Sequence, residues 1–172
     1  MSHPGVTFRP ATLDDVDGVL ALWAGAGAEP TSTDDPDGLR ALLGHDAGAL
    51  IVAEHGGRIV GSVIAGWDGW RGSVHRLVVT PGHRRSGLGM ALVERAEARL
   101  AAVGARRLQA IVVASDSRAT AFWGSTAWRR QTERLRYVRG GAGEDGAGED
   151  GAGEDGAGLR RPAPSSTPPA PG

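Results

Sequence analysis

The hydrophobic pattern between residues 49 and 113 changes period twice, and this change constrains the fold more than any other feature of the chain. Apolar residues first recur in the short runs typical of strands, over Ala49–Glu54, Ile59–Trp67 and Gly72–Thr80. The first two runs are joined by His55-Gly56-Gly57-Arg58, a hairpin turn of the Gly-Gly type. This part of the sequence predicts an antiparallel meander of three strands.

The two changes of period predict a helix followed by a further strand. Gly104 ends the helix, and Leu108–Val113 is mostly apolar and reads as the strand. Five apolar residues share one face of that helix, predicted over Ser86–Val103: Leu88, Leu92, Ala96, Leu100 and Val103. Strand, helix and strand of these lengths form a βαβ unit, whose two strands are parallel with a right-handed crossover.

Weaker signals add elements before this unit. Val6–Pro10 alternates and reads as a short strand. Thr12-x-x-Asp15 resembles a capping box and starts an apolar-periodic helix, and a short helix follows around Leu39–Leu43. These signals place a strand and two helices ahead of the meander.

Further elements follow the unit. Asp116 or Ser115 caps a helix from Arg118 to about Ser125, and residues 128–131 and 134–139 look like a closing pair of strands. The sequence therefore predicts an α+β fold. Its mixed, mostly antiparallel sheet has six to seven strands, a central βαβ unit and flanking helices.

The composition changes at Gly140. From there to Gly172 the chain holds three GAGED repeats and a Pro/Ser/Ala run, without an aromatic residue. Such a segment buries too little apolar surface to offset the entropy of ordering it. We predict a folded domain over residues 1–139 and a disordered tail over residues 140–172.

Composition excludes several classes of protein. The absence of cysteine excludes a disulfide scaffold, a thiolate nucleophile and a cysteine metal site. No His/Asp/Glu spacing indicates a metal, and the small positive charge of the domain does not predict a nucleic-acid partner. The first residues lack a signal-peptide pattern, and the apolar runs are too short to span a membrane. We expect a cytoplasmic protein without a membrane partner.

The segment Arg76–Met90 carries the chemistry. A strand ends at Thr80-Pro81, and a basic turn and a glycine-rich helix start follow. The first amides of a helix have no intrahelical acceptor, the helix dipole favours anions, and Gly87 and Gly89 let a ligand approach the backbone. The segment predicts a pyrophosphate site. It lacks the Gly-Lys-Ser/Thr of a Walker A loop and the third glycine of a dinucleotide fingerprint. A glycine-capped surface helix is the alternative.

The motif Arg84-x-x-Gly87-x-Gly89, after a Leu-x-Val-x-Pro strand, resembles the acetyl-CoA-binding motif of the GCN5-related N-acetyltransferases, the GNAT family. The order of elements from Val6 to Val138 is similar to that family's order. The resemblance implies the GNAT fold.

A second signature strengthens the resemblance. Asp116-x-x-Ala119-x-x-Phe122-Trp123 lies where the family has Asn-x-x-Ala-x-x-Phe-Tyr. Asp in place of Asn accepts a hydrogen bond from the pantetheine arm but donates none.

The resemblance implies that acetyl-CoA, the acyl donor, enters between the two parallel strands, which splay in the family. Backbone groups of Leu77, Val78 and Val79 then pair with the pantetheine arm. The remaining residues of the implied cofactor site are Arg84, Arg85, Ser86, Gly87, Leu88, Gly89, Met90, Asp116, Phe122 and Trp123.

The family's reaction is direct transfer of the acetyl group to an amine, here of a small molecule or a peptide. An amine with a pKa near 10 needs a base at pH 7. His75 is the best candidate, although an ordinary, partly exposed strand histidine is the alternative; Glu54 and Asp68 are further candidates. The resemblance implies that the Val79 amide is the oxyanion donor.

Two departures from the family leave a second hypothesis open. Leu108–Val113 contains no acid where many members carry a Glu base, and Trp123 stands where many carry a Tyr acid. A catalytically weak acyl-CoA-binding sensor or scaffold therefore competes with the N-acetyltransferase. Members often dimerise, and the sequence leaves a homodimer open.

The acceptor is not identified by the sequence. The four acids of the loop Glu29–Asp37 either attract a cationic amine or belong to an ordinary solvated loop with helix caps. Trp67 and Trp70 either line an acceptor pocket or finish the core.

Overall fold

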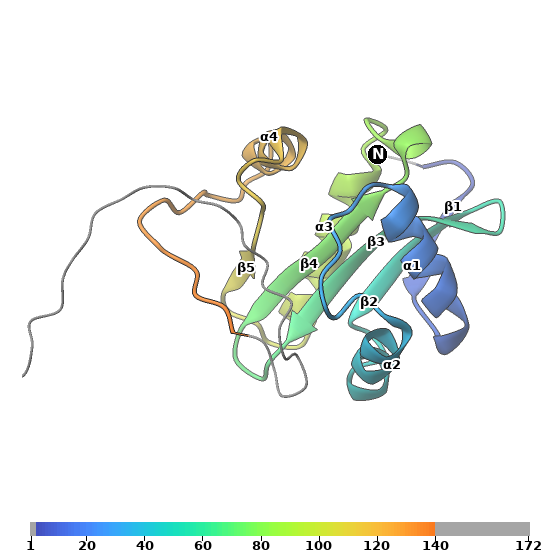
Figure 1. Ribbon diagram of the computed structural model, residues 1–172, viewed down its shortest axis with the longest axis horizontal. Helices are drawn as coiled ribbons and strands as arrows, with labels where there is room; N and C mark the ends of the chain where they lie inside the picture. Colours follow the sequence, from blue (N-terminus) through green and yellow to red (C-terminus); the bar gives the residue numbers. More distant parts are fainter. Residues whose placement is uncertain (1–2, 140–172) are drawn as a thin grey trace, which may run out of the picture. The chain divides into compact units, whose positions relative to one another are not determined.

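The computed structural model describes residues 3–139, and their strands form one mixed sheet (Figure 1). Neighbouring strands β1 to β4 are antiparallel, whereas β5 is parallel to β4. The strands lie in the order β1 (Val6–Pro10), β2 (Leu50–His55), β3 (Arg58–Trp67), β4 (Gly72–Val79) and β5 (Leu108–Ala110). The meander and the parallel βαβ unit predicted from periodicity are confirmed.

Helices cover both faces of this sheet. α1 (Val16–Gly25) and α2 (Pro36–His45) pack on one face, and α3 (Leu88–Ala102), which connects β4 to β5, packs on the other. α4 (Ser117–Gly124) follows β5. Single 3₁₀ turns, η1 (Leu13–Asp15) and η2 (Pro81–His83), precede α1 and follow β4. None of the helices in the described part of the chain is long and apolar enough to cross a bilayer.

The core has two halves because strand side chains alternate between the faces. On β2, Leu50 and Val52 join the α1/α2 side, whereas Ile51 and Ala53 join the α3 side. The predicted face of α3 is buried except at Val103, which caps the helix and is 39% exposed. Each fully buried aliphatic side chain contributes about 1.5–3 kcal/mol, so the sheet is stabilised from both faces.

Local signals in the sequence set the element boundaries. The backbone N–H of Thr12 donates to Asp15 Oδ2 at 2.7 Å, which confirms the capping box. Gly56 and Gly57 have φ of 57° and 74°, as a two-residue hairpin turn of the I′ type requires. Asp116 caps α4, the first of the two residues predicted for that role.

A bulge interrupts β4 beside its splayed end. Ser62 pairs with Val78 and Ile64 with His75, so one extra residue lies on β4 opposite Val63. Arg76, in this bulge, has φ of 49°. The bulge changes which residues of β4 face α1 and α2.

The predicted strand count is wrong for the described residues, in which the sheet has five strands. Residues 128–131 and 134–139 form no strand. Arginine alternates there with few apolar residues, and Leu135 is 80% exposed, so no apolar face is buried against the sheet. β5 also ends at Ala110 instead of Val113.

The chain divides into two compact units after Leu135, and all described helices and strands belong to the first unit. The predicted boundary at residue 139 stays a prediction. The tail predicted over residues 140–172 lies outside the described residues.

Candidate functional site

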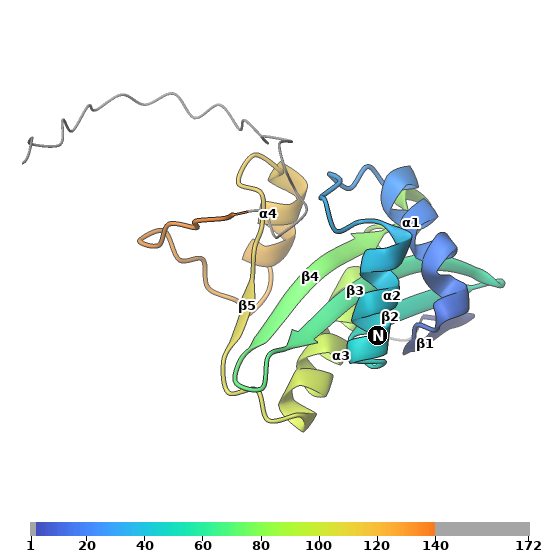
Figure 2. The ribbon, with the colours of Figure 1, turned by 60° about the horizontal axis from the view of Figure 1, so that its bottom comes forward.

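The parallel strands β4 and β5 part after three paired positions. Gly72 pairs with Leu108 and Val74 with Ala110, where the ladder ends. β4 continues to Val79, while the chain after β5 leaves toward α4 (Figure 2). The backbone of β4 between residues 75 and 79 therefore has no partner strand on the β5 side within the described chain. This is the splay that the resemblance implied.

Val79 turns its backbone toward that splay. The N–H of Thr80 donates to Val60 O at 2.9 Å, so Thr80 faces β3, and the alternation of a strand turns Val79 the other way. Val79 O accepts from Arg84 Nε at 3.0 Å. By the same alternation Val78, paired with Ser62, uses its backbone within the sheet. Of the predicted residues, Val79 is the one best oriented to donate into the splay.

The N-terminus of α3 forms a backbone cradle beyond β4. Arg85 and Gly87 have φ of 63° and 84°, and such left-handed turns aim neighbouring amides at one point. Ala91 N donates to Gly87 O at 3.0 Å, so the amides of Leu88, Gly89 and Met90 precede the first i→i−4 bond of the helix. These amides suit an anionic group.

The side chain of Arg84 braces this turn. Besides Val79 O, it donates through Nη2 to Ala26 O at 2.7 Å. Ser86 Oγ donates to His83 O at 2.7 Å and closes the turn. Arg84 and Ser86 thus shape the cradle through their side chains.

α4 borders the cradle through Phe122. A β-carbon on Gly89 would lie 3.3 Å from Phe122 Cε2, so the ring lies against the start of α3. Trp123 stacks edge-on with Trp128, their centroids 4.9 Å apart, and packs against the α3-side core. Asp116 Oδ1 accepts from the amides of residues 118 and 119, which commits this oxygen to the helix cap. Phe122 lies at the cradle, whereas Trp123 is oriented toward the core.

His75 lies at the point where β4 and β5 part. It is exposed and pairs with Ile64, which packs on the α1/α2 side of the sheet. His75 is therefore on that side, one residue beyond the last β5 pairing. Its position is compatible with a base that serves an acceptor on the α1/α2 side.

The other two candidate bases have different surroundings. Glu54 accepts from Arg9 Nη2 at 2.8 Å and lies on β2, which β3 separates from β4. Asp68 accepts from the amides of Trp70 and Arg71 at 2.8 and 2.6 Å, and the hydrogen bonds from Arg71 and Trp70 lower its pKa. The position of His75 on β4, where β4 and β5 part, favours it over both carboxylates.

The loop between α1 and α2 is held by Arg76, a residue that sequence reasoning did not single out. Its guanidinium forms an ion pair with Asp34, and burial lowers its pKa. Asp35 caps α2, and Asp37 pairs with Arg40 at 3.1 Å. Three of the loop's four acids thus have structural partners. The one sequence signal that could have pointed to Arg76 is a permanent charge just before the apolar run Leu77–Val79 of β4.

The tryptophans beside the splay differ in burial. Trp67 packs against the α3-side core. Trp70 is 67% exposed, with the guanidinium carbon of Arg71 3.8 Å from its ring centroid. Trp67 thus completes the core, whereas Trp70 remains at the surface.

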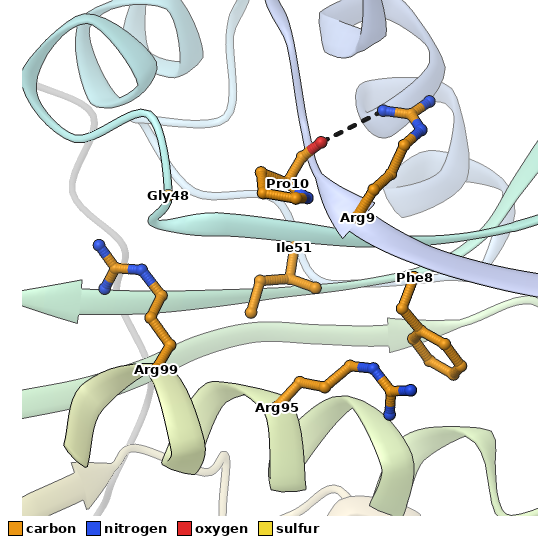
Figure 3. Close-up of a pocket in the computed structure, with 7 residues that line it drawn as sticks. All are labelled: Phe8, Arg9, Pro10, Gly48, Ile51, Arg95 and Arg99. Atoms are coloured by element: carbon orange, nitrogen blue, oxygen red, sulfur yellow. Dashed lines mark hydrogen bonds between the residues drawn. The ribbon is translucent and has the colours of Figure 1, made fainter. Parts of the chain in front are cut away.

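A pocket of about 320 Å³ lies elsewhere, between β1, β2 and α3 (Figure 3). Its lining residues are Phe8, Arg9, Pro10, Gly48, Ile51, Arg95 and Arg99. The guanidinium carbon of Arg95 lies 3.5 Å from the Phe8 ring centroid, and Arg99 Nη2 pairs with Asp46 Oδ2 at 2.5 Å. None of the predicted site residues lines this pocket.

Comparison with known proteins agrees with this geometry. The profile of the Acetyltransferase (GNAT) family matches residues 18–126. An acetyltransferase of Pectobacterium atrosepticum is 37% identical over 99 residues, which cover 58% of this chain and 70% of that protein.

Solved structures share the fold. Ard1 of Thermoplasma volcanium superposes with a TM-score of 0.63 at 16% identity, over 70% of this chain and 80% of that one. A predicted acetyltransferase of Clostridium acetobutylicum, solved with acetyl-CoA, gives 0.61 at 13% identity, over 77% and 96%. With the family profile covering most of the domain, the chain belongs to the GNAT family of acetyltransferases, which are acyl-CoA-dependent N-acyltransferases.

Proposed function

We propose that this chain transfers an acetyl group from acetyl-CoA to a primary amine of a small molecule or peptide by direct attack. The observation that carries the proposal is the splay of β4 from β5 next to the backbone cradle of α3. An open strand edge suits the amide-bearing arm of the donor, and the cradle suits its pyrophosphate.

The residues of the cradle fit this donor. Gly89 N lies in the first turn of α3, and the absence of a side chain at this residue lets the Phe122 ring approach the start of the helix. Arg85 is exposed beside the cradle and adds positive charge. The solved relative of Clostridium acetobutylicum, whose title names acetyl-CoA, supports the choice of donor.

The reaction needs a neutral amine and a place for negative charge. An amine with a pKa near 10 is about one part in a thousand neutral at pH 7, which costs about 4 kcal/mol. His75 is the proposed base, directly or through water, because it is exposed at the vertex of the splay. The Val79 N–H is the proposed donor to the carbonyl oxygen as the nitrogen–carbon bond forms and the carbon–sulfur bond breaks.

The competing proposal is an acyl-CoA-binding sensor without turnover. It is favoured by Trp123, which packs toward the core where many family members have a tyrosine acid. Tight CoA binding with no turnover in any amine tested would support this proposal. Amine-dependent turnover that is lost in His75→Ala would refute it.

Release of CoA thiol, measured with a panel of spermidine, neamine and a peptide with a free N-terminus, tests the leading proposal. We expect release that depends on at least one amine. Gly89→Val should abolish it, because a β-carbon there would lie 3.3 Å from Phe122 Cε2 and the larger side chain would displace the ring that borders the cradle. The control is Gly44→Val in α2, whose β-carbon meets nothing within 4 Å. The proposal fails if neither acetyl-CoA nor CoA raises the melting temperature at millimolar concentration.

A further inference from the structure

Arg76 is a charged residue held inside the sheet at the candidate site. It occupies the β4 bulge with φ of 49°, a conformation that is rare for residues other than glycine. Its side chain is only 16% exposed. A half-buried arginine with a left-handed backbone beside a candidate active site calls for a physical role.

Its guanidinium binds the loop between α1 and α2 at three residues. Arg76 Nε donates to Asp34 Oδ1 at 2.9 Å, and Nη2 donates to Asp34 Oδ2. Nη1 donates to Glu29 O and Nη2 to Thr31 Oγ1, both at 2.8 Å. Four of the five N–H donors of a guanidinium are thus used on the loop. Arg76 therefore uses most of its hydrogen-bond donors to hold the loop, and only one N–H donor remains for a ligand.

The backbone of Arg76 is fixed from the opposite direction. Ser62 Oγ donates to Arg76 O at 3.2 Å, and Trp23 Nε1 donates to Ser62 Oγ at 2.8 Å. Ser62 is fully buried, and the Trp23 ring lies under the guanidinium, 5.1 Å from its carbon. α1, β3 and the loop therefore all meet at this residue.

The loop between α1 and α2 is connected both to the candidate base, His75, and to the candidate oxyanion donor, Val79. His75 precedes Arg76 and lies on the same side of the sheet as α1 and α2. The start of the loop is held separately, by the bond from Arg84 Nη2 to Ala26 O, and Arg84 also binds Val79 O. Loop, base candidate and oxyanion donor are thus connected by two arginines.

We propose that Arg76 and Asp34 are a positioning pair that fixes the α1–α2 loop as the wall against which the acceptor amine is oriented. The inference rests on the proposed function. Because Arg76 neutralises Asp34, that carboxylate is not the attractant for a cationic amine, and its role is to hold the loop. The pair acts through placement of the loop, so its loss weakens use of the amine and leaves the acetyl-CoA cradle intact.

Two variants and a matched control test the pair. Arg76→Lys keeps the charge but cannot bridge Asp34, Glu29 O and Thr31 together. The double variant Arg76→Gln/Asp34→Asn removes both charges and leaves neither one buried alone. Arg40→Lys makes the same exchange in an exposed arginine–aspartate pair of α2 and serves as the control.

The readouts are KM for the amine of the panel that reacts fastest, KM for acetyl-CoA, and amide hydrogen exchange over residues 26–35. We expect both variants to raise the amine KM about tenfold or more. Both variants should leave the KM for acetyl-CoA within about twofold of the wild-type value. They should speed amide hydrogen exchange in this loop alone. The control should match the wild type.

An unchanged amine KM and unchanged loop exchange would overturn the inference. A parallel rise of both KM values with a fall in melting temperature would also overturn it, because it indicates a merely structural role. Absence of CoA binding by the wild type refutes the proposed function itself, so the two failures are distinguishable.

Discussion

Asp15 shows how one side chain organises the entry to the fold. It accepts from Arg9 Nη1 at 2.6 Å and from the backbone N–H of Thr12 at 2.7 Å. The hydrogen bond from Arg9 is the largest cause that lowers the pKa of Asp15. The ionised form therefore caps η1 and joins it to β1.

Asp15→Asn should destabilise the protein at pH 7 by about 1–3 kcal/mol, because it removes a charged acceptor from Arg9. The folded pKa of Asp15 lies below its unfolded value, so this contribution is complete above about pH 4 and is lost as the pH falls further. The difference between wild type and variant should therefore shrink in acid. Urea unfolding between pH 7 and pH 2.5 measures it.

Asp14→Asn, an exposed neighbour in the same turn, is the control and should stay within about 0.5 kcal/mol of the wild type. A gap between wild type and Asp15→Asn that is the same at every pH would contradict the role given to the ionised carboxyl.

Single residues also mark the limit of prediction from the sequence. The capping box at Asp15 and the left-handed glycines of the hairpin were predictable because both signals are local. The role of Arg76 was not, because its partner Asp34 lies 42 positions away and is brought close only by the sheet. Long-range polar contacts have no periodic signature.

At the scale of elements, Gly72 permits the close approach of β4 to β5 and α3. A β-carbon there would lie 2.6 Å from Leu108 Cδ2 and 2.9 Å from Leu100 Cδ1. Distances this short force the two leucines or the strand to move.

We expect Gly72→Ala to destabilise the protein by about 1–3 kcal/mol through overpacking. Gly44→Ala in α2 is the matched control, because its β-carbon meets nothing within 4 Å and alanine favours a helix by about 0.5–1 kcal/mol. Chemical unfolding compares the two. Equal effects of both changes would show that Gly72 is not a packing position.

Helix α3 followed from periodicity because its apolar residues share one face, and the meander followed because its short apolar runs are separated by turn residues. The closing strands did not form although Leu135 and Tyr137 alternate with arginines, because both side chains stay exposed, at 80% and 89%, and no apolar face is buried. The bulge at Arg76 was also beyond the sequence, because it depends on how β3 and β4 pair.

At the scale of the molecule, the site combines elements from three places in the chain. The splay comes from β4 and β5, the cradle from α3, and its border from Phe122 on α4. The two motifs that resemble the family contain the cradle and Phe122, so these parts of the proposed donor site were predictable. The proposed acceptor side depends on contacts between distant segments, such as Arg76 with Asp34, and was not predictable.

Deleting residues 140–172 should leave the melting temperature and CoA affinity unchanged, since the family match ends at residue 126 and α4 ends at Gly124. A chain that stops at Thr126 should melt lower. It loses Trp128, whose indole N–H donates to Glu97 at 2.5 Å and whose ring contacts Trp123. Thermal melting with and without CoA compares these forms. A loss of CoA binding in the chain that lacks only residues 140–172 would show that the tail contributes to the site.

Calorimetric titration of the full chain with acetyl-CoA tests the central claim most directly. We predict saturable binding at one site per chain, with a Kd between about 1 μM and 1 mM. Gly89→Val should lose this binding, whereas Gly44→Val should retain it. No heat at millimolar acetyl-CoA, or the same titration curve for Gly89→Val as for the wild type, would contradict the assignment of the β4–α3 cradle as the donor site.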